Sequence, residues 1–234
     1  MDIIWQGLVQ AVELLVGGDA QVWGIVGLSL LVSGTATAIS TALGVPLGLA
    51  LALGRFPART GVISVVNSGM GLPPVVVGLG LSLLLWRTGP LGGLHLLYTP
   101  GAMVLAQVLL ALPLVAGLTL AAVQQLDPRL RLQILALGAT RGQLARLLLR
   151  EIRGPLLGAV MAGFGAVISE VGASLMVGGN ILGETRVLTT ATVLATGRGE
   201  FDVAIALSTI LLGLTFLVAG GLTWLQQRGP HLDE

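Results

Sequence analysis

The chain has 234 residues, of which 54% are hydrophobic and only 10% are charged, and its formal net charge is +1. Soluble domains carry about 25% charged residues, so the composition excludes an ordinary soluble domain and predicts a multi-pass membrane protein. The small net charge gives no indication of nucleic-acid binding, and the absence of cysteine excludes disulfides and thiolate metal sites. The two histidines, His95 and His231, lie far apart in the sequence and predict no metal site.

Residues 1–19 predict an amphipathic helix followed by a break. Apolar side chains recur at helical spacing over residues 3–16, a segment too short to cross a bilayer, which needs about 20 residues. One face holds Ile4, Leu8, Val12 and Leu15, and Gly17, Gly18 and Asp19 then end the helix. The helix either lies in the membrane interface or packs on the end of a helical bundle. No basic segment precedes it, so we expect no cleaved signal peptide.

Long runs without charge predict five membrane-spanning helices and therefore an all-α membrane protein. Each run is long enough to cross about 30 Å of hydrocarbon at about 1.5 Å per residue. The expected spans are residues 22–53, 62–86, 101–125, 156–177 and 203–225, within one transmembrane domain of residues 20–228. The first span is longer than a bilayer requires, so it tilts or extends beyond the membrane. A short tail, residues 229–234, follows the last span.

The arginines predict the orientation of the chain, because cytoplasmic loops carry an excess of basic residues. If residues 127–155 are cytoplasmic, nine arginines lie inside and three lie outside. The inside set is Arg55, Arg59, Arg129, Arg131, Arg141, Arg146, Arg150, Arg153 and Arg228, and the outside set is Arg87, Arg186 and Arg198. We therefore expect the N-terminus outside and the C-terminus, with the tail, in the cytoplasm.

Two features inside the spans are candidates for a translocation pathway. Pro73 and Pro74 interrupt the second span, and a broken helix in a membrane is tolerated where it lines a cavity or is covered by protein. They mark either part of a pathway or a simple packing kink. Glu170 is the only formal charge inside a span, where an isolated carboxylate is costly. It either hydrogen-bonds a neighbouring helix or loop, or it forms an outer gate hinge or a subunit contact.

The last outside loop, residues 178–202, is rich in threonine and predicts a short re-entrant or interfacial helix. Within it Asn180, Arg186, Thr189 and Thr190 are candidates for the pathway or its gate. Hydroxyl donors and a guanidinium suit an oxyanion, because they offer several N–H and O–H groups to its oxygens. The alternative is that the threonines only cap and pack the loop.

The segment from Asp127 to Pro155 holds six of the chain's arginines and predicts a cytoplasmic docking loop. Asp127 and Pro128 begin a first helix, Gly138 breaks it, and Thr140 caps a second helix that ends before Pro155. The second helix carries Arg146, Arg150 and Arg153 on one arc and Leu144, Leu147 and Leu148 largely on another. Such a two-sided helix either offers one face to a partner or only enforces the topology.

Several motifs resemble those of ABC importer permeases. The stretch Leu137–Arg141 resembles the centre of their cytoplasmic EAA loop, although Leu132–Ile134 replace the usual Glu-Ala-Ala and Arg150-Glu151 replace a frequent Leu-Pro. Leu72–Gly78 is similar to the L-P-P-x-V-x-G stretch of molybdate- and sulfate-type permeases. Ser169–Ala173 with Gly179-Asn180 resembles their G-E-F-G-A and G-N segments. The stretches Gly179–Ile181, Thr185–Ala191 and Gly199–Phe201 together are similar to the tungstate permease branch.

This resemblance covers nearly the whole chain and implies a type I ABC importer permease in a prokaryotic plasma (inner) membrane. It implies a homodimeric path for an oxyanion, tungstate first, with molybdate or sulfate as alternatives. Two ATPase subunits would hold ATP and Mg and would bind the coupling loop, and an extracytoplasmic oxyanion-binding protein would deliver the substrate. The expected ATPase contacts are Leu137, Gly138, Ala139, Thr140, Arg141 and Gln143. No cofactor is expected in this chain.

Other classes of function fit the sequence less well. There is no G-x-x-x-x-G-K-[ST] phosphate-binding loop, so we expect a permease and not an enzyme that hydrolyses ATP. A stand-alone secondary transporter would show an internal repeat or several intramembrane ionisable groups. A membrane-embedded enzyme would need a metal-ligand cluster or a cysteine nucleophile, and the sequence contains neither. A specific anion site in the permease and regulation by cytoplasmic oxyanion stay open.

Overall fold

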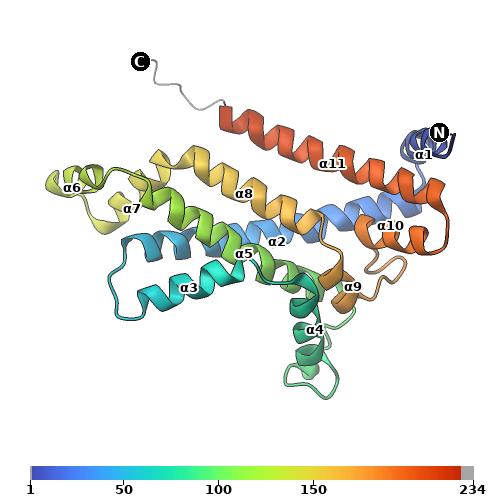
Figure 1. Ribbon diagram of the computed structural model, residues 1–234, viewed down its shortest axis with the longest axis horizontal. Coiled ribbons are helices and arrows are strands. Elements are labelled where there is room, and N and C mark those ends of the chain that lie inside the picture. Colours follow the sequence, from blue (N-terminus) through green and yellow to red (C-terminus); the bar gives the residue numbers. More distant parts are fainter. Residues whose placement is uncertain (1, 228–234) are drawn as a thin grey trace.

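The chain folds into a bundle of helices. The computed structural model describes residues 2–227, so the predicted tail of residues 229–234 lies outside the described residues. Within residues 2–227 every regular element is helical, which confirms the predicted class. The elements are α1 (Asp2–Val16), α2 (Ala20–Leu53), α3 (Arg59–Gly69), α4 (Pro74–Leu85), η1 (Gly92–Leu94), α5 (Pro100–Gln124), α6 (Pro128–Ala136), α7 (Arg141–Glu151), α8 (Arg153–Ile168), α9 (Gly172–Gly178), α10 (Leu188–Gly197) and α11 (Phe201–Gln227) (Figure 1).

The long helices α2 and α5 form the centre of the bundle and share its most extensive contact. The contact is close because α2 presents glycine to α5. A Cβ atom added at Gly48 would overlap the carbonyl oxygen of Ala116, and one at Gly44 would lie 3.1 Å from the carbonyl oxygen of Leu112. Small residues let two backbones approach, and such close packing is a main source of association energy between helices in lipid.

The number of membrane spans is confirmed only in part. Within residues 2–227, three helices are long and apolar enough to cross a membrane: α2, α5 and α11. The number rises to as many as five if each bent pair is one span. One pair is α3 with α4, bent by 105°, and the other is α7 with α8, bent by 74°. The first bend lies where the sequence predicted a break, since α3 ends at Gly69 and Pro74 opens α4.

One predicted helix is wrong in its extent. Residues 156–177 do not form one continuous helix, because α8 ends at Ile168 and α9 begins at Gly172. Apolar composition continues through the break, so hydropathy alone does not register it. The backbone instead changes direction at Glu170, whose carboxylate accepts a hydrogen bond from the first turn of α9.

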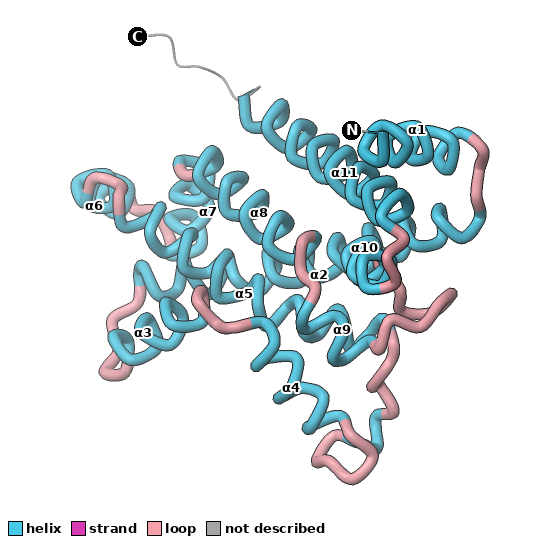
Figure 2. The backbone as a smooth tube through the Cα atoms, turned by 45° about the vertical axis from the view of Figure 1, so that its right-hand side comes forward, coloured by secondary structure: helices cyan, strands magenta, loops and turns pink. Residues whose placement is uncertain are grey.

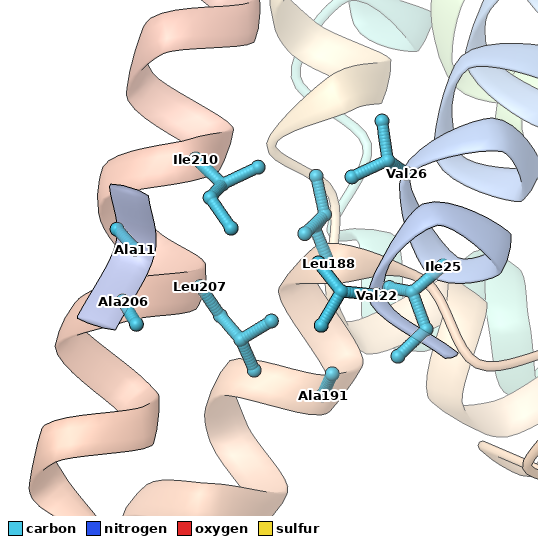
Figure 3. Close-up of a cluster of buried hydrophobic side chains, with 9 residues drawn as sticks. All are labelled: Ala11, Val22, Ile25, Val26, Leu188, Ala191, Ala206, Leu207 and Ile210. Atoms are coloured by element: carbon cyan, nitrogen blue, oxygen red, sulfur yellow. The ribbon is translucent and has the colours of Figure 1, made fainter. Parts of the chain in front are cut away.

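Helix α1 packs on α11 through small residues and leaves most of its large apolar side chains exposed. Ala11 is buried in a cluster with residues of α2, α10 and α11 (Figure 3), and a Cβ atom at Gly7 would lie 2.6 Å from the Cβ of Ile205. The predicted apolar face is largely exposed, with Ile4 at 60% and Val12 at 61%. The two alternatives for this helix are therefore compatible: it contacts the bundle on one side and retains an apolar side for an interface.

The elements lie in two groups along the long axis of the molecule. Helices α6 and α7 lie at one end, hereafter the α6 end, and α1 and α10 lie at the other, hereafter the α10 end (Figures 1 and 2). Helix α4 leaves the bundle sideways and contacts mainly α9. The predicted ATPase contacts lie at the α6 end, and the candidates in residues 178–202 lie at the α10 end. Pro73 and Pro74 lie at the start of α4.

Candidate functional site

The break between α8 and α9, residues 169–171, is held by hydrogen bonds to buried groups. Glu170 is only 9% exposed, and its Oε1 accepts from the backbone N–H of Ala173 at 2.8 Å. The Thr189 hydroxyl donates to the carbonyl oxygen of Glu170 at 2.9 Å. The two predicted candidates Glu170 and Thr189 are thus in direct contact. Glu170 closes the first turn of α9 and ties it to α10, which agrees with the predicted hydrogen-bonding alternative.

Helix α4 meets the same break through glycine. A Cβ atom at Gly172 would lie 2.8 Å from Val75 Cγ2, and one at Gly78 would lie 2.8 Å from the Cα of Ala173. Pro74 is therefore close in sequence to a tight α4–α9 contact. Pro74 precedes Val75, which contacts the first residue of α9, so the two prolines lie next to the break.

A buried amide that the sequence did not single out bridges α5 to the break. Gln107 is 2% exposed, and its Nε2 donates to the carbonyl oxygen of Val167 at 3.1 Å and to the Ser174 hydroxyl at 3.5 Å. Its Oε1 has no hydrogen-bond partner among the described residues. The sequence does show this amide in the middle of an apolar span, which could have marked it as a candidate. Hydropathy does not say, however, which helix such a side chain faces.

Asn180 and Arg186 form a clamp in the loop between α9 and α10. Asn180 adopts a left-handed backbone conformation with a φ of 54°. Its Oδ1 accepts from Arg186 Nε at 3.1 Å, and its carbonyl oxygen accepts from Arg186 Nη2 at 3.2 Å. Its Nδ2 also donates to the carbonyl oxygen of Thr190 at 3.3 Å. The structure thus brings together three of the residues predicted in this loop.

The hydroxyl groups of Thr185, Thr189 and Thr190 already donate hydrogen bonds to backbone carbonyl oxygens. The Thr190 hydroxyl donates to the carbonyl oxygen of Val187 at 3.1 Å, and the Thr185 hydroxyl donates to the carbonyl oxygen of Gly178. Thr189 donates to the break as described above. A hydroxyl has one proton to donate, so these groups would have to break internal bonds before they could bind an oxyanion. The role of Thr189 and Thr190 in a pathway stays a prediction.

Arg186 retains donors that the clamp does not use. The clamp engages its Nε and Nη2, and no carboxylate in the described part of the chain pairs with the guanidinium. Arg186 is half-buried and lines an open groove of about 620 Å³ beside the first half of α2. This groove, hereafter the α2 groove, is also lined by Gly24, Gly27, Leu31, Leu182 and Glu184.

At the α6 end the chain turns a sharp corner between α6 and α7, at residues 137–140. The amide of Ala139 donates to the carbonyl oxygen of Ile134 at 3.4 Å, and the amide of Gly138 donates to that of Leu135 at 3.0 Å. These two bonds are those of a Schellman helix end, in which the residue after the helix takes a positive φ. Gly138 has a φ of 81°, so glycine is the residue that this corner favours.

A capping box opens the next helix directly after the corner. The Thr140 hydroxyl accepts from the amide of Gln143 at 3.3 Å, and Gln143 Oε1 accepts from the amide of Thr140 at 2.8 Å. The predicted cap at Asp127 is also present, since its carboxylate accepts from the amide of Arg129 at 2.8 Å. Of the leucines predicted on one arc of this helix, Leu144 and Leu148 are buried and Leu147 is 42% exposed. Arg153, predicted on the same helix, instead begins α8, because α7 ends at Glu151.

The corner projects from the bundle with its apolar apex uncovered. Leu137 is 88% exposed and Leu132, on α6, is 66% exposed. The expected contacts Gly138, Thr140, Arg141 and Gln143 are also exposed, whereas Ala139 is half-buried. Large exposed apolar side chains on a hydrogen-bonded corner are typical of a surface that contacts another protein.

Comparison with known proteins identifies a family. The sequence pattern described as "Binding-protein-dependent transport system inner membrane component" matches residues 44–228. The chain is 41% identical over 228 residues to the tungstate uptake system permease protein of Peptoclostridium acidaminophilum, which covers 97% of this chain and 100% of that protein. It is 34% identical to the protein of the same description from Campylobacter jejuni, over 92% of this chain and 90% of that protein.

More distant likenesses agree with this family. The molybdenum transport system permease protein of Escherichia coli K12 is 31% identical, over 78% of this chain and 84% of that protein. Among solved structures, a bacterial ABC transporter involved in the import of the acidic polysaccharide alginate aligns with a TM-score of 0.74 and 19% identity, over 90% of this chain and 80% of that chain. At this identity the structural likeness concerns the fold alone.

Proposed function

Since the chain belongs to the family of binding-protein-dependent transport system inner membrane components and is a permease subunit of an ABC importer, we propose that it imports tungstate. The observation that carries the choice of substrate is the identity of 41% to a tungstate permease over the full length of that protein. The identity to the molybdenum permease is lower, at 31%, and it covers less of the chain.

Two copies of the chain would form the translocation path. Support comes from α4, which leaves the bundle and buries only Gly78, Leu81 and Leu85 of its own residues. Its other large apolar side chains are uncovered, with Val76 at 60% and Leu83 at 63% exposure. Such a surface in a membrane protein is covered by lipid or by protein, and we propose a second copy. Pro73, Pro74 and Glu170 would then lie beside the path, where the break between α8 and α9 meets α4.

The corner at residues 137–140 would carry the mechanical coupling. Its Schellman end and capping box fix the direction of α7 relative to α6. A movement of the ATPase subunit against the corner would therefore move both helices together. Leu137 would insert into the ATPase subunit, which holds ATP and Mg, and the extracytoplasmic binding protein would dock at the α10 end. This assignment places the α6 end and the C-terminus in the cytoplasm, as the arginine count predicts.

The test is reconstitution of the permease with its ATPase subunits and binding protein in lipid nanodiscs. We expect ATP hydrolysis to rise when the binding protein carries tungstate. Stimulation by molybdate-loaded or sulfate-loaded protein, with none by tungstate, would overturn the choice of substrate. Absence of stimulation by all three oxyanions would overturn the oxyanion importer itself.

A further inference from the structure

We propose that the α2 groove is the binding site for an acidic side chain of the extracytoplasmic binding protein. The proposal rests on the proposed function, because it requires that partner and an α10 end that faces outward. It goes further by naming the place of contact, the cation that makes it and the chemistry that it recognises.

The cation is Arg186, whose guanidinium is anchored on one side and free on the other. Asn180 accepts from Nε and Nη2, while Nη1 has no partner in the described chain. A half-buried guanidinium without a paired anion favours an incoming carboxylate, because its planar group donates two parallel hydrogen bonds. The clamp holds the group in position beforehand, so little side-chain entropy is lost when a partner binds.

The loop around Arg186 is held by internal hydrogen bonds and carries exposed apolar side chains. The amide of Ile181 donates to the Thr185 hydroxyl at 2.9 Å, and the amide of Arg186 donates to the carbonyl oxygen of Ile181 at 3.0 Å. Leu182 nevertheless remains 51% exposed beside the cation. A central arginine with a rim of apolar side chains has the composition of a protein-binding hot spot.

Two glycines leave a gap between the side chains of the opposite wall, which α2 forms. Gly24 and Gly27 are exposed, and no atom lies within 4 Å of a Cβ atom added to either residue. Helix α2 has 34 residues, or about 51 Å at 1.5 Å per residue, and about 30 Å suffices to cross the hydrocarbon. Its first turns can therefore extend beyond the hydrocarbon, where a protein outside the membrane reaches them.

A protein carboxylate fits the groove better than a free oxyanion does. Among the described residues Arg186 is the only cation that lines it, and Glu184 lies in the same wall. Glu184 repels any anion that enters, and it repels an oxyanion with two negative charges more strongly than a single carboxylate. No threonine hydroxyl of the neighbouring loop is free to offset that repulsion. A single carboxylate needs only the guanidinium, and the apolar rim adds contacts that an inorganic ion cannot use.

The first test fills the groove without touching the clamp. In nanodiscs with the complete transporter, Gly27→Leu is compared with Gly34→Leu, because Gly34 lies on the same helix, has the same open space and does not line the groove. We expect Gly27→Leu to weaken the affinity for the binding protein about tenfold or more, the range of a hot-spot contact. Gly34→Leu should stay within about twofold. Gly24→Leu repeats the block at a second position, and basal ATP hydrolysis monitors folding.

The second test removes the charge. Arg186→Gln should weaken the affinity, and the remaining affinity should depend less on salt than that of the wild type between about 50 and 500 mM NaCl, since screening acts on the lost pair. Unchanged affinity in Gly27→Leu, Gly24→Leu and Arg186→Gln, with the wild type still stimulated by tungstate-loaded binding protein, would overturn the docking site and leave the proposed function intact. Two other results would overturn the docking site in favour of a pathway role for Arg186. One is loss of transport in Arg186→Gln with unchanged affinity for the binding protein, and the other is Arg186-dependent binding of tungstate alone to the permease. A wild type that binds no such protein would overturn both.

Discussion

Replacing Gly138 with alanine tests whether the corner between α6 and α7 carries the coupling. Gly138 has a φ of 81°, and no atom lies within 4 Å of a Cβ atom added there. The substitution therefore introduces no clash and strains only the backbone. Gly142→Ala is the matched control, because it also adds one methyl group in open space, but on the helical backbone of α7.

The structure sets the size of the effect. A residue other than glycine in the left-handed region costs about 1–2 kcal/mol, which corresponds to about a 5- to 30-fold change in an equilibrium. Gly138→Ala should therefore reduce the affinity of the ATPase subunit by about that factor. Gly138→Asn should lose less, because asparagine tolerates this conformation. Gly138→Pro should abolish coupling, because the proline ring fixes φ near about −65° and removes the amide that donates to Leu135.

The assay measures two quantities on the purified permease in nanodiscs: the affinity for the ATPase subunit and the stimulation of ATP hydrolysis by loaded binding protein. Membrane insertion and yield should be equal in all variants. The reasoning is refuted if Gly138→Ala equals the wild type in both quantities. It is also refuted if Gly142→Ala is impaired as strongly as Gly138→Ala, because backbone strain would then not be the cause.

Further substitutions at three positions, Gly48, Thr140 and Glu170, test the packing and the caps. Gly48→Ala should lower the free energy of unfolding by about 1–3 kcal/mol, the usual cost of overpacking, while Gly34→Ala on the same helix should not destabilise; equal values in denaturant unfolding would contradict the close α2–α5 contact. Thr140→Ala should lower the free energy of unfolding by about 1 kcal/mol through loss of the capping box, and it should slow the ATP hydrolysis that loaded binding protein stimulates. An unchanged hydrolysis rate would show that coupling does not need the capped corner. Glu170→Gln should keep transport because its amide oxygen can still accept from Ala173, whereas Glu170→Ala should lower the melting temperature; loss of transport in a stable Glu170→Gln would assign a role to the charge itself.

Local features of the chain could be predicted from the sequence because they depend on neighbouring residues. The N-cap at Asp127, the helix end at Gly138 and the cap at Thr140 each use bonds that span only a few residues, and all three are present. The all-helical membrane class follows from composition in the same way. The break at Pro73 and Pro74 was also predictable, since proline removes a helical hydrogen bond wherever it occurs.

Features that depend on contacts between distant segments were decided by the tertiary structure. The break at Glu170 interrupts an apolar stretch, and it is stabilised by Gln107 from α5 and by Thr189 from α10. The clamp of Arg186 by Asn180 requires a left-handed residue and a loop that folds back on itself.

Composition and local residue order therefore determined that this protein lies in a membrane, that it is helical and where its basic corner turns. Only the tertiary structure decided which polar groups are already bonded and which remain free, because a buried hydroxyl, amide or guanidinium takes its partner from whichever helix packs beside it. The threonines that suggested an oxyanion contact proved to donate their hydroxyl protons to backbone carbonyls, whereas Nη1 of Arg186 has no partner among the described residues.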